Sequence, residues 1–375
     1  MPIRIVHTAD NHIGIPYRQF NEELRRQLVS ERFEALVRLV RTANDREADF
    51  FVVAGDLFDS TRVKVTDIDR TVEVLKEFSG EAVLIVPGNH DFVSGPESDL
   101  WKRFRRSCES VNNIVVLDEP VVREFEVGGM LIQFFPCPCP SKTGRDSTIG
   151  WVAGVQRQAT AVRIGIAHGN VTGLGLDDAD RYFSMDRQAL EAAGLTTWLL
   201  GHIHVPFPMT DSGEHSPYFM AGIHTPDSVR VRHGGSAWYL ECEPDRVLRY
   251  EKLGPGRIRF VRIEKELRNE TDVAALEQRC REFDPGSTIL DLQLTGHLSP
   301  GDRLKFRDVL SGPGQKFLLL TVEDNIRDRI DAGRIASTYP AGSLAARLLT
   351  ALVNDSEFPE AATLAYELIQ EVSPR

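Results

Sequence analysis

Short, almost wholly apolar segments constrain the fold of this chain more than any other feature. ADFFVVA at residues 48–54 and AVLIV at residues 82–86 lack the polar–apolar alternation of a half-exposed strand. Such segments are typical of strands in a sheet that is covered on both faces. Residues 21–47 and 66–78 carry apolar side chains at helical spacing. Strands that alternate with helices in this way predict a layered α/β sandwich.

Further strands continue this series along the chain. We expect them at residues 4–7, 131–135, 163–167 and 197–200. Two more segments have the pattern of an antiparallel sheet, at residues 236–241 and 258–263. We therefore expect one large domain that spans residues 1–265.

The pattern changes after that point. Helices are expected at residues 272–283 and 301–310, and strands at residues 288–294 and 316–322, with proline and glycine between them. Two amphipathic helices follow, at residues 343–353 and 357–372, and Pro359 suits the first turn of the second. Residues 266–375 are thus predicted to form a small α+β domain.

Composition narrows the classes of protein and of partner. The chain has 375 residues, of which 42% are hydrophobic and 26% charged, so a disordered chain is excluded. Its net charge of -11 does not favour nucleic-acid binding, so phosphate groups would have to meet local basic patches or bound metal ions. No apolar run approaches the ~18 residues of a membrane helix, and the first residues do not resemble a signal peptide. Five scattered cysteines fit a reducing cytosol, so we expect a cytoplasmic protein.

Polar motifs stand at the ends of five of the apolar strands. Because the carboxyl ends of strands line the ligand crevice of an open α/β sheet, these motifs can meet at one place. They are Asp10-Asn11-His12, Gly55-Asp56-Leu57-Phe58-Asp59, Gly88-Asn89-His90-Asp91, His168-Gly169-Asn170 and Gly201-His202-Ile203-His204.

The residue types in these motifs point to metal ions. Carboxylate, amide oxygen and imidazole together suit Mn²⁺, Fe²⁺ or Zn²⁺, and the lack of cysteine argues against a structural zinc site. One ion does not need all these ligands, whereas two ions about 3.5–4 Å apart that share a carboxylate would use them all. Two metal ions that share a carboxylate in this way are the arrangement of two-metal phosphoesterases.

The motifs resemble a known signature. Asp-x-His, Gly-Asp-x-x-Asp, Gly-Asn-His-Asp, His and Gly-His-x-His are similar to those of the calcineurin-like metallophosphoesterases, whose fold is a two-sheet sandwich flanked by helices. HTADNHIG at residues 7–14, GDLFDS at 55–60, PGNHD at 87–91, GHIHVP at 201–206 and the turn Gly235-Ser236 most resemble the SbcD-type DNA-repair nucleases. Bacterial members of the YhaO kind fit as well. The likeness covers residues 1–265, and residues 266–375 resemble the family's capping domain in placement and size.

The resemblance implies a manganese-dependent nuclease that processes DNA ends beside an SMC-like coiled-coil ATPase. Two rival hypotheses remain open. One is a two-metal phosphodiesterase or phosphatase for another substrate, and the other is a DNA-end-binding scaffold without catalysis. The additional domain favours a macromolecular substrate, and the acidic net charge weakly opposes one.

The resemblance also implies roles for single residues. One ion would take Asp10, His12, Asp56 and His204, and the other would take Asp56, Asn89, His168 and His202. His90 would face the scissile phosphate, with Asp91 on its other ring nitrogen. Asp59 stands where part of the family has a histidine, so we expect it to support the site rather than touch substrate.

Several other features have ordinary structural interpretations. Cys137-Pro138-Cys139 does not have the spacing of a redox or zinc motif, so we expect a loop with inert thiols. Basic residues that are candidates for DNA contact are Lys102, Arg103, Arg105 and Arg106 on a helix, and Arg230 and Arg232 near the last motif.

A homodimer is also expected if apolar groups stay exposed on two helices. The first carries Ile68, Val72, Leu75 and Phe78, and the second, at residues 99–111, carries Leu100, Trp101 and Phe104. The terminal helices are the alternative apolar interaction surface and would suit binding of the ATPase; their apolar residues are Leu348, Leu349, Leu352 and Leu368.

Overall fold

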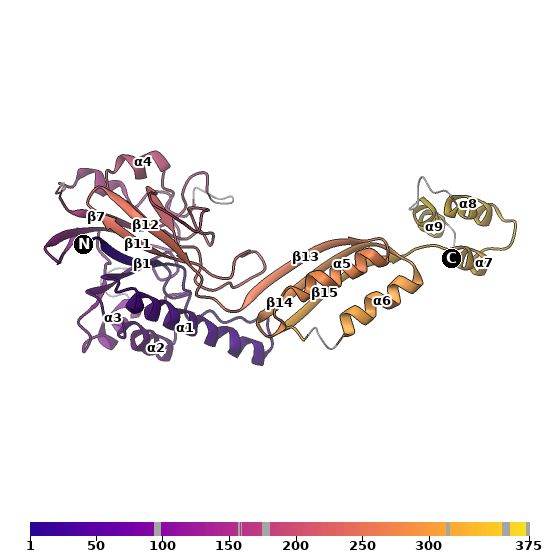
Figure 1. Ribbon diagram of the computed structural model, residues 1–375, viewed down its shortest axis with the longest axis horizontal. Helices are drawn as coiled ribbons and strands as arrows, with labels where there is room; N and C mark the ends of the chain where they lie inside the picture. The colour runs from indigo at the N-terminus through magenta and orange to yellow at the C-terminus, as the bar shows by residue number, and fades with distance from the viewer. Residues whose placement is uncertain are drawn as a thin grey trace. The chain divides into compact units, whose positions relative to one another are not determined.

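A computed structural model describes residues 1–93, 99–156, 158, 160–174, 181–312, 316–354 and 361–372. The chain forms two compact units, Met1–Arg259 and Phe260–Arg375 (Figure 1). The division lies a few residues before the predicted boundary, because the strand expected at residues 258–263 pairs within the second unit. Its assignment to an antiparallel sheet of the first unit was wrong.

Two sheets form the centre of the first unit. The seven-stranded sheet has the order β4-β3-β2-β1-β11-β12-β9, and the five-stranded sheet has the order β10-β8-β7-β6-β5. β1 to β4 pair in parallel, whereas β11 pairs antiparallel with β1 and β12. The strands are β1 (Ile3–Thr8), β2 (Phe50–Ala54), β3 (Ala82–Val86), β4 (Ile114–Val116), β5 (Arg123–Val127), β6 (Met130–Cys137), β7 (Val162–His168), β8 (Thr197–Gly201), β9 (Ser212–Gly213), β10 (Tyr218–Met220), β11 (Ala237–Glu243) and β12 (Arg246–Leu253).

The apolar strands are explained by burial on both faces. In β2, Phe50 and Val52 pack between the sheets with Ile132 and Ile164, whereas Phe51 packs on the helical side. Helices α1 (Glu22–Asp45), α2 (Val65–Leu75) and α3 (Asp99–Ser107) contribute to the core on that side. Helix α4 (Arg187–Ala192) packs with β6 and β8 on the five-stranded sheet. The predicted sandwich is confirmed.

The second unit contains a small sheet and several helices. The sheet has the order β13-β14-β15 and packs with two helices around Leu276, Leu292 and Phe306. A separate small core joins the last helices through Ile335 and Leu349. The predicted start of the last helix, residues 357–360, lies outside the described residues. The elements are β13 (Arg259–Leu267), α5 (Glu270–Arg281), β14 (Thr288–Leu298), α6 (Pro300–Ser311), β15 (Leu319–Asp328), α7 (Ala332–Thr338), α8 (Leu344–Val353) and α9 (Ala361–Val372).

The structure corrects the expected dimer surface. All seven apolar residues on which that expectation rested are buried in the core of the first unit, so none is free to pair with a second copy: Ile68, Val72, Leu75, Phe78, Leu100, Trp101 and Phe104.

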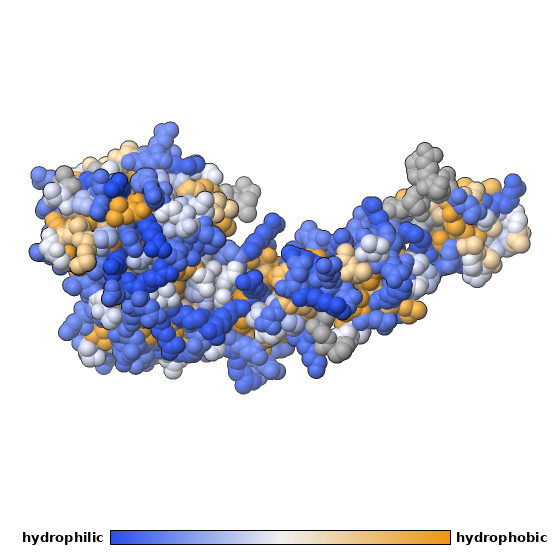
Figure 2. Space-filling view, in the orientation of Figure 1, coloured by the Kyte–Doolittle hydropathy of each residue, from blue (hydrophilic) through white to orange (hydrophobic). Residues whose placement is uncertain are grey.

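The terminal helices α8 and α9, unlike α2 and α3, expose several apolar side chains. Leu348 and Leu368 are exposed, together with Leu344, Leu364 and Val372, whereas Leu349 is buried. Figure 2 shows hydrophobic surface over these helices. Among the described residues, no helix is both long enough and apolar enough to cross a membrane.

Candidate metal centre

The five motifs meet at the carboxyl ends of β1, β2, β3, β7 and β8. Main-chain hydrogen bonds join neighbouring motifs: Asp10 N donates to Gly55 O at 3.1 Å, and His12 N donates to Asp56 O at 2.9 Å. The amide of His202 donates to the Asp10 carboxylate at 2.9 Å. Side chains that are far apart in the sequence are thereby held at one edge of the two sheets.

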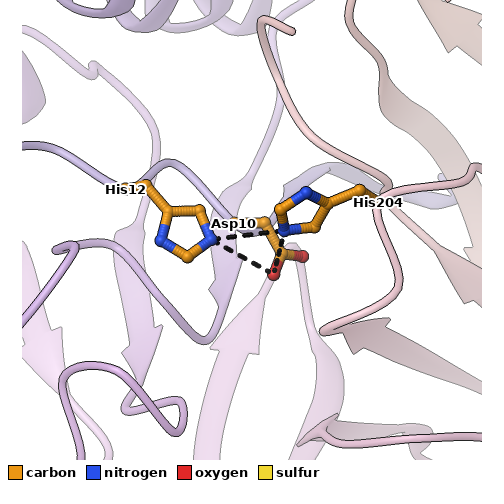
Figure 3. A group of neighbouring side chains, drawn as sticks. All are labelled: Asp10, His12 and His204. Atoms are coloured by element: carbon orange, nitrogen blue, oxygen red, sulfur yellow. Dashed lines mark hydrogen bonds and ion pairs between the residues drawn. The ribbon is translucent and has the colours of Figure 1, made fainter. Parts of the chain in front are cut away.

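One set of donor atoms comes from Asp10, His12 and His204 (Figure 3). The Nε2 atoms of the two histidines lie 3.3 Å apart. Oδ1 of Asp10 lies 3.6 Å from His204 Nε2 and 3.9 Å from His12 Nε2. All three donor atoms therefore converge on a common point.

A second set comes from Asn89, His168 and His202. Oδ1 of Asn89 lies 3.0 Å from His168 Nε2 and 3.1 Å from His202 Nδ1. The ring of His168 donates from Nδ1 to Ala54 O at 2.9 Å, so Nε2 is the nitrogen that faces the other donors.

Asp56 lies between the two sets. A single oxygen, Oδ2, is 3.2 Å from His168 Nε2 and 3.8 Å from His12 Nε2. Its other oxygen, Oδ1, accepts from the amide of His90 at 2.8 Å. Asp56 is therefore oriented so that one oxygen can serve both sets.

These separations fit divalent ions. Bonds of about 2.0–2.2 Å to nitrogen and oxygen place neighbouring ligand atoms about 3.0–3.5 Å apart, close to the spacings in both sets. The donors are carboxylate, amide and imidazole, without a thiolate. The seven predicted ligand residues thus form a cluster that fits a dinuclear metal site.

The carboxylates and imidazoles of the cluster shift one another's pKa values. Burial opposes ionisation of Asp56, but the neighbouring His168 lowers the pKa of this carboxyl below its usual range. Burial likewise opposes the charged form of His168, yet Asp56 raises its pKa to about 10. His202 shows the opposite shift, because burial and the charge of His168 lower its pKa to about 4. A metal ion would displace the His168 proton, so metal binding is expected to release a proton.

Four of the ligand residues have a backbone conformation that L-residues rarely adopt. The φ angles are 51° at Asp10, 43° at His12, 52° at Asp56 and 95° at His202. Such conformations cost about 1–3 kcal/mol each and persist only where the surroundings enforce them. Backbone strain is therefore concentrated at the candidate ligands.

This strain predicts an unusual order of stability at position 202. We expect His202→Gly to be more stable than His202→Ala, because only glycine adopts a φ near 95° without a steric penalty. A difference of about 1 kcal/mol would separate the unfolding midpoints by about 2–4 °C in a unit of this size. Thermal unfolding of both variants in EDTA measures it. An alanine variant that is as stable as the glycine variant would contradict the inferred strain.

The side chain of His168 packs so closely against residue 55 that only glycine fits there. Its φ is 86°, and a Cβ atom here would lie 2.0 Å from His168 Nδ1. Gly201 similarly leaves room for the main-chain oxygen of Ala54, which a Cβ would approach to 2.2 Å. These glycines therefore allow the strand ends to pack closely around His168.

The surroundings of His90 correct one expectation. Nδ1 of His90 donates to the main-chain oxygen of Asp59 at 2.9 Å. The carboxylate of Asp91, expected at this nitrogen, instead accepts from Phe58 N at 3.0 Å and Gly88 N at 2.7 Å. Asp91 is buried, and its side chain ties two motif loops together rather than orienting His90.

Asp59 lies where a supporting residue was expected. Its carboxylate oxygen Oδ1 is 3.4 Å from Nδ1 of His12, whose Nε2 belongs to the first donor set. Burial opposes ionisation of Asp59, but the contact with His12 lowers the pKa of its carboxyl. A carboxylate on the outer nitrogen of an imidazole ligand fixes the ring orientation.

The predicted DNA contacts lie in two places. Arg103, Arg105 and Arg106 are exposed on α3, where Arg105 pairs with Asp118. Arg230 and Arg232 are exposed on the loop that also carries His233, whose Nε2 donates to His204 O at 2.7 Å. The second pair is thus on a loop that touches the first donor set.

Sequence reasoning missed several residues around the cluster. The ring of Tyr182 lies over His202, with the ring centroids 4.9 Å apart. Arg32 and Asp227 approach the first donor set from α1 and from the loop after β10. No motif marks these positions, because each contact joins elements that are distant in sequence.

Cys137 and Cys139 do not both lie in the predicted loop, because Cys137 ends β6. Cys137 and Cys139 are buried, and burial raises the pKa of the Cys137 thiol to about 12. A thiol with such a pKa carries almost no thiolate at neutral pH, which is the form that reacts.

Comparison with known proteins agrees with this geometry. Over 338 residues, 89% of this chain and 70% of the relative, the chain is 26% identical to DNA double-strand break repair protein Mre11 of Haloferax volcanii. It is 24% identical to Mre11 of Aeropyrum pernix, over 70% of this chain and 64% of that protein. It is 23% identical to the uncharacterized metallophosphoesterase YhaO of Bacillus subtilis, over 66% of this chain and 59% of that protein. The family model described as calcineurin-like phosphoesterase matches residues 3–206, and the chain belongs to this family.

Proposed function

We propose that this protein is a metal-dependent DNA nuclease that hydrolyses phosphodiester bonds at DNA ends during repair. The observation that carries the proposal is the pair of donor sets joined by Asp56 Oδ2, in a chain that aligns over 89% of its length with an Mre11 protein. The donor sets support phosphoester chemistry. The two Mre11 relatives support DNA as the substrate.

The proposed site holds two divalent ions, with Mn²⁺ as the favoured metal. Asp10, His12, Asp56 and His204 would hold one, and Asp56, Asn89, His168 and His202 would hold the other. Bound ions would supply a water nucleophile of lowered pKa and neutralise charge on the phosphate. The protein's own contribution is to orient the imidazoles and carboxylates before any ion arrives.

His90 is proposed to transfer a proton. Its Nδ1 donates to Asp59 O, so Nε2 is the nitrogen that remains for the substrate. The ring lies 4.8 Å from that of His12, centroid to centroid, and is only partly buried. From this place an imidazolium can stabilise charge on the phosphate or protonate the leaving oxygen.

The proposal also covers the DNA contacts, the protein partner and the cellular location. Arg230 and Arg232 are favoured over the arginines of α3 for DNA contact, because their loop touches His204 through His233. We assign the exposed leucines of α8 and α9 to an SMC-like ATPase partner, and the second unit to the capping role. Five free, buried cysteines accord with a cytoplasmic location.

Cleavage of DNA in a metal-dependent manner tests the proposal. Linear end-labelled duplex, closed circular plasmid and a small chromogenic phosphodiester are each incubated with Mn²⁺, Mg²⁺, Zn²⁺ or EDTA. We expect release of labelled nucleotides or fragments from linear duplex with Mn²⁺ and none with EDTA. Turnover of the chromogenic diester without cleavage of either DNA would reject a nuclease.

The match to YhaO supports a second candidate, a phosphodiesterase for another substrate. The same assay separates the two, because this candidate predicts turnover of the small diester alone. A non-catalytic scaffold predicts DNA binding in a mobility-shift assay, with no turnover of any substrate under any metal.

A further inference from the structure

Arg32 of α1 is a charged residue buried behind the first donor set. Its side chain is 1% exposed. Nη1 donates to the main-chain oxygen of Asn11 at 2.6 Å, and Nε donates to the hydroxyl of Tyr17 at 2.7 Å. Asn11 separates the ligand residues Asp10 and His12, so the guanidinium holds the backbone that presents both of them.

Asp227 stands between this arginine and a ligand. Its Oδ2 is 3.9 Å from Arg32 Nη2 and 3.8 Å from Nδ1 of His204. These are ion-pair separations and are longer than hydrogen bonds. Nε2 of His204 faces Asp10 and His12 at the same time. The carboxylate of Asp227 therefore faces the outer nitrogen of a ring whose inner nitrogen faces the ion.

The second donor set is supported differently. The outer nitrogen of His168 donates to a main-chain oxygen, that of Ala54. In the first set, by contrast, the outer nitrogens of His12 and His204 face the side-chain carboxylates of Asp59 and Asp227. A carboxylate at this position fixes the ring and strengthens the imidazole as a ligand, and its loss typically lowers metal affinity 10–100-fold.

We propose that Asp227 is a positioning residue for His204, held in place by Arg32, and that it sets the affinity of the first donor set alone. This inference rests on the proposed two-ion site. Arg32 balances the charge of Asp227 across the 3.9 Å that separates Nη2 from Oδ2. Neither residue touches the reacting atoms, so their effect passes entirely through the first ion.

Manganese titration of the whole chain tests this inference without any nucleic acid. Isothermal titration calorimetry and Mn²⁺ paramagnetic resonance count the ions and give an affinity for each. We expect Asp227→Asn to weaken one ion about 10–100-fold and leave the other within about threefold. Asp227→Glu should restore part of the loss. Asp245→Asn, an exposed change in the turn between β11 and β12, is the matched control and should bind as wild type.

Double variants identify which ion is affected. In the His204→Ala background, Asp227→Asn should lower the manganese affinity little further, because both changes act on the same ion. In the His202→Ala background, the two losses of affinity should add, because the changes act on different ions. Wild-type affinity for both ions in Asp227→Asn overturns the inference, and so does equal weakening of both. Fewer than two ions in the wild type overturns the inference together with the two-ion site. Two ions bound without DNA cleavage would reject the nuclease and leave this inference standing.

Discussion

Asp56→Asn is expected to abolish Mn²⁺-dependent hydrolysis while the chain stays folded. Oδ2 of Asp56 lies close to both donor sets, and an amide cannot supply the bridging negative charge. The fold should survive, because the Asp56 main-chain oxygen still accepts from His12 N and the amide oxygen can still accept from His90 N. We expect a loss of about 10³-fold, at the upper end of the range measured when one group that stabilises a transition state electrostatically is removed.

The measurement compares initial rates on linear duplex with the unfolding midpoint of the same preparation. Asp45→Asn, an exposed change on α1, is the matched control and should leave both quantities unchanged. Turnover within tenfold of wild type would reject a bridging role for Asp56. A large drop in midpoint without metal would show instead that Asp56 is needed for folding.

His90→Ala should lower the rate by about 10²–10⁴ and leave both ions bound. The expectation follows because the adjacent residues Asn89 and His90 direct their side chains to different partners. Asn89 directs Oδ1 at His168 and His202, whereas His90 turns its ring toward Asp59 O and beside His12. Removal of the ring takes away a proton donor but no donor atom of either set.

Metal analysis and kinetics together check this prediction. The bound manganese of the variant is counted after desalting, and the initial rate is measured on linear duplex. His215→Ala, at an exposed position, provides the matched control. Loss of one ion in His90→Ala would make His90 a ligand and contradict the assigned role.

Local patterns placed the candidate ligands at the ends of apolar strands, for a physical reason. An apolar strand that is buried on both faces ends where its backbone reaches the edge of the sheet, and polar residues begin there. The motif at Asp10, the motif at Asp56 and the motif at Asn89 each follow such a strand. Parallel strands present their ends at the same edge, so the chain order of the motifs was enough to bring their donors together.

Other features depend on side-chain direction and could not be read from local patterns. Val72 and Leu75 have the spacing of an apolar face, but only packing shows that the core of the first unit already covers this face. Adjacent loops likewise decide that the main chain of Asp59, and not Asp91, holds His90.

The sequence by itself determined the alternating architecture of the first unit, the family signature and the position of the seven candidate ligands at the ends of apolar strands. Each of these is encoded in residues that are close together or in the order of motifs. Only the tertiary structure decided that strand β13 joins the second unit, that backbone strain gathers at His202, and that Arg32 and Asp227 support His204. These contacts join segments up to about 200 residues apart, where periodicity carries no information and the directions of individual side chains determine which atoms meet.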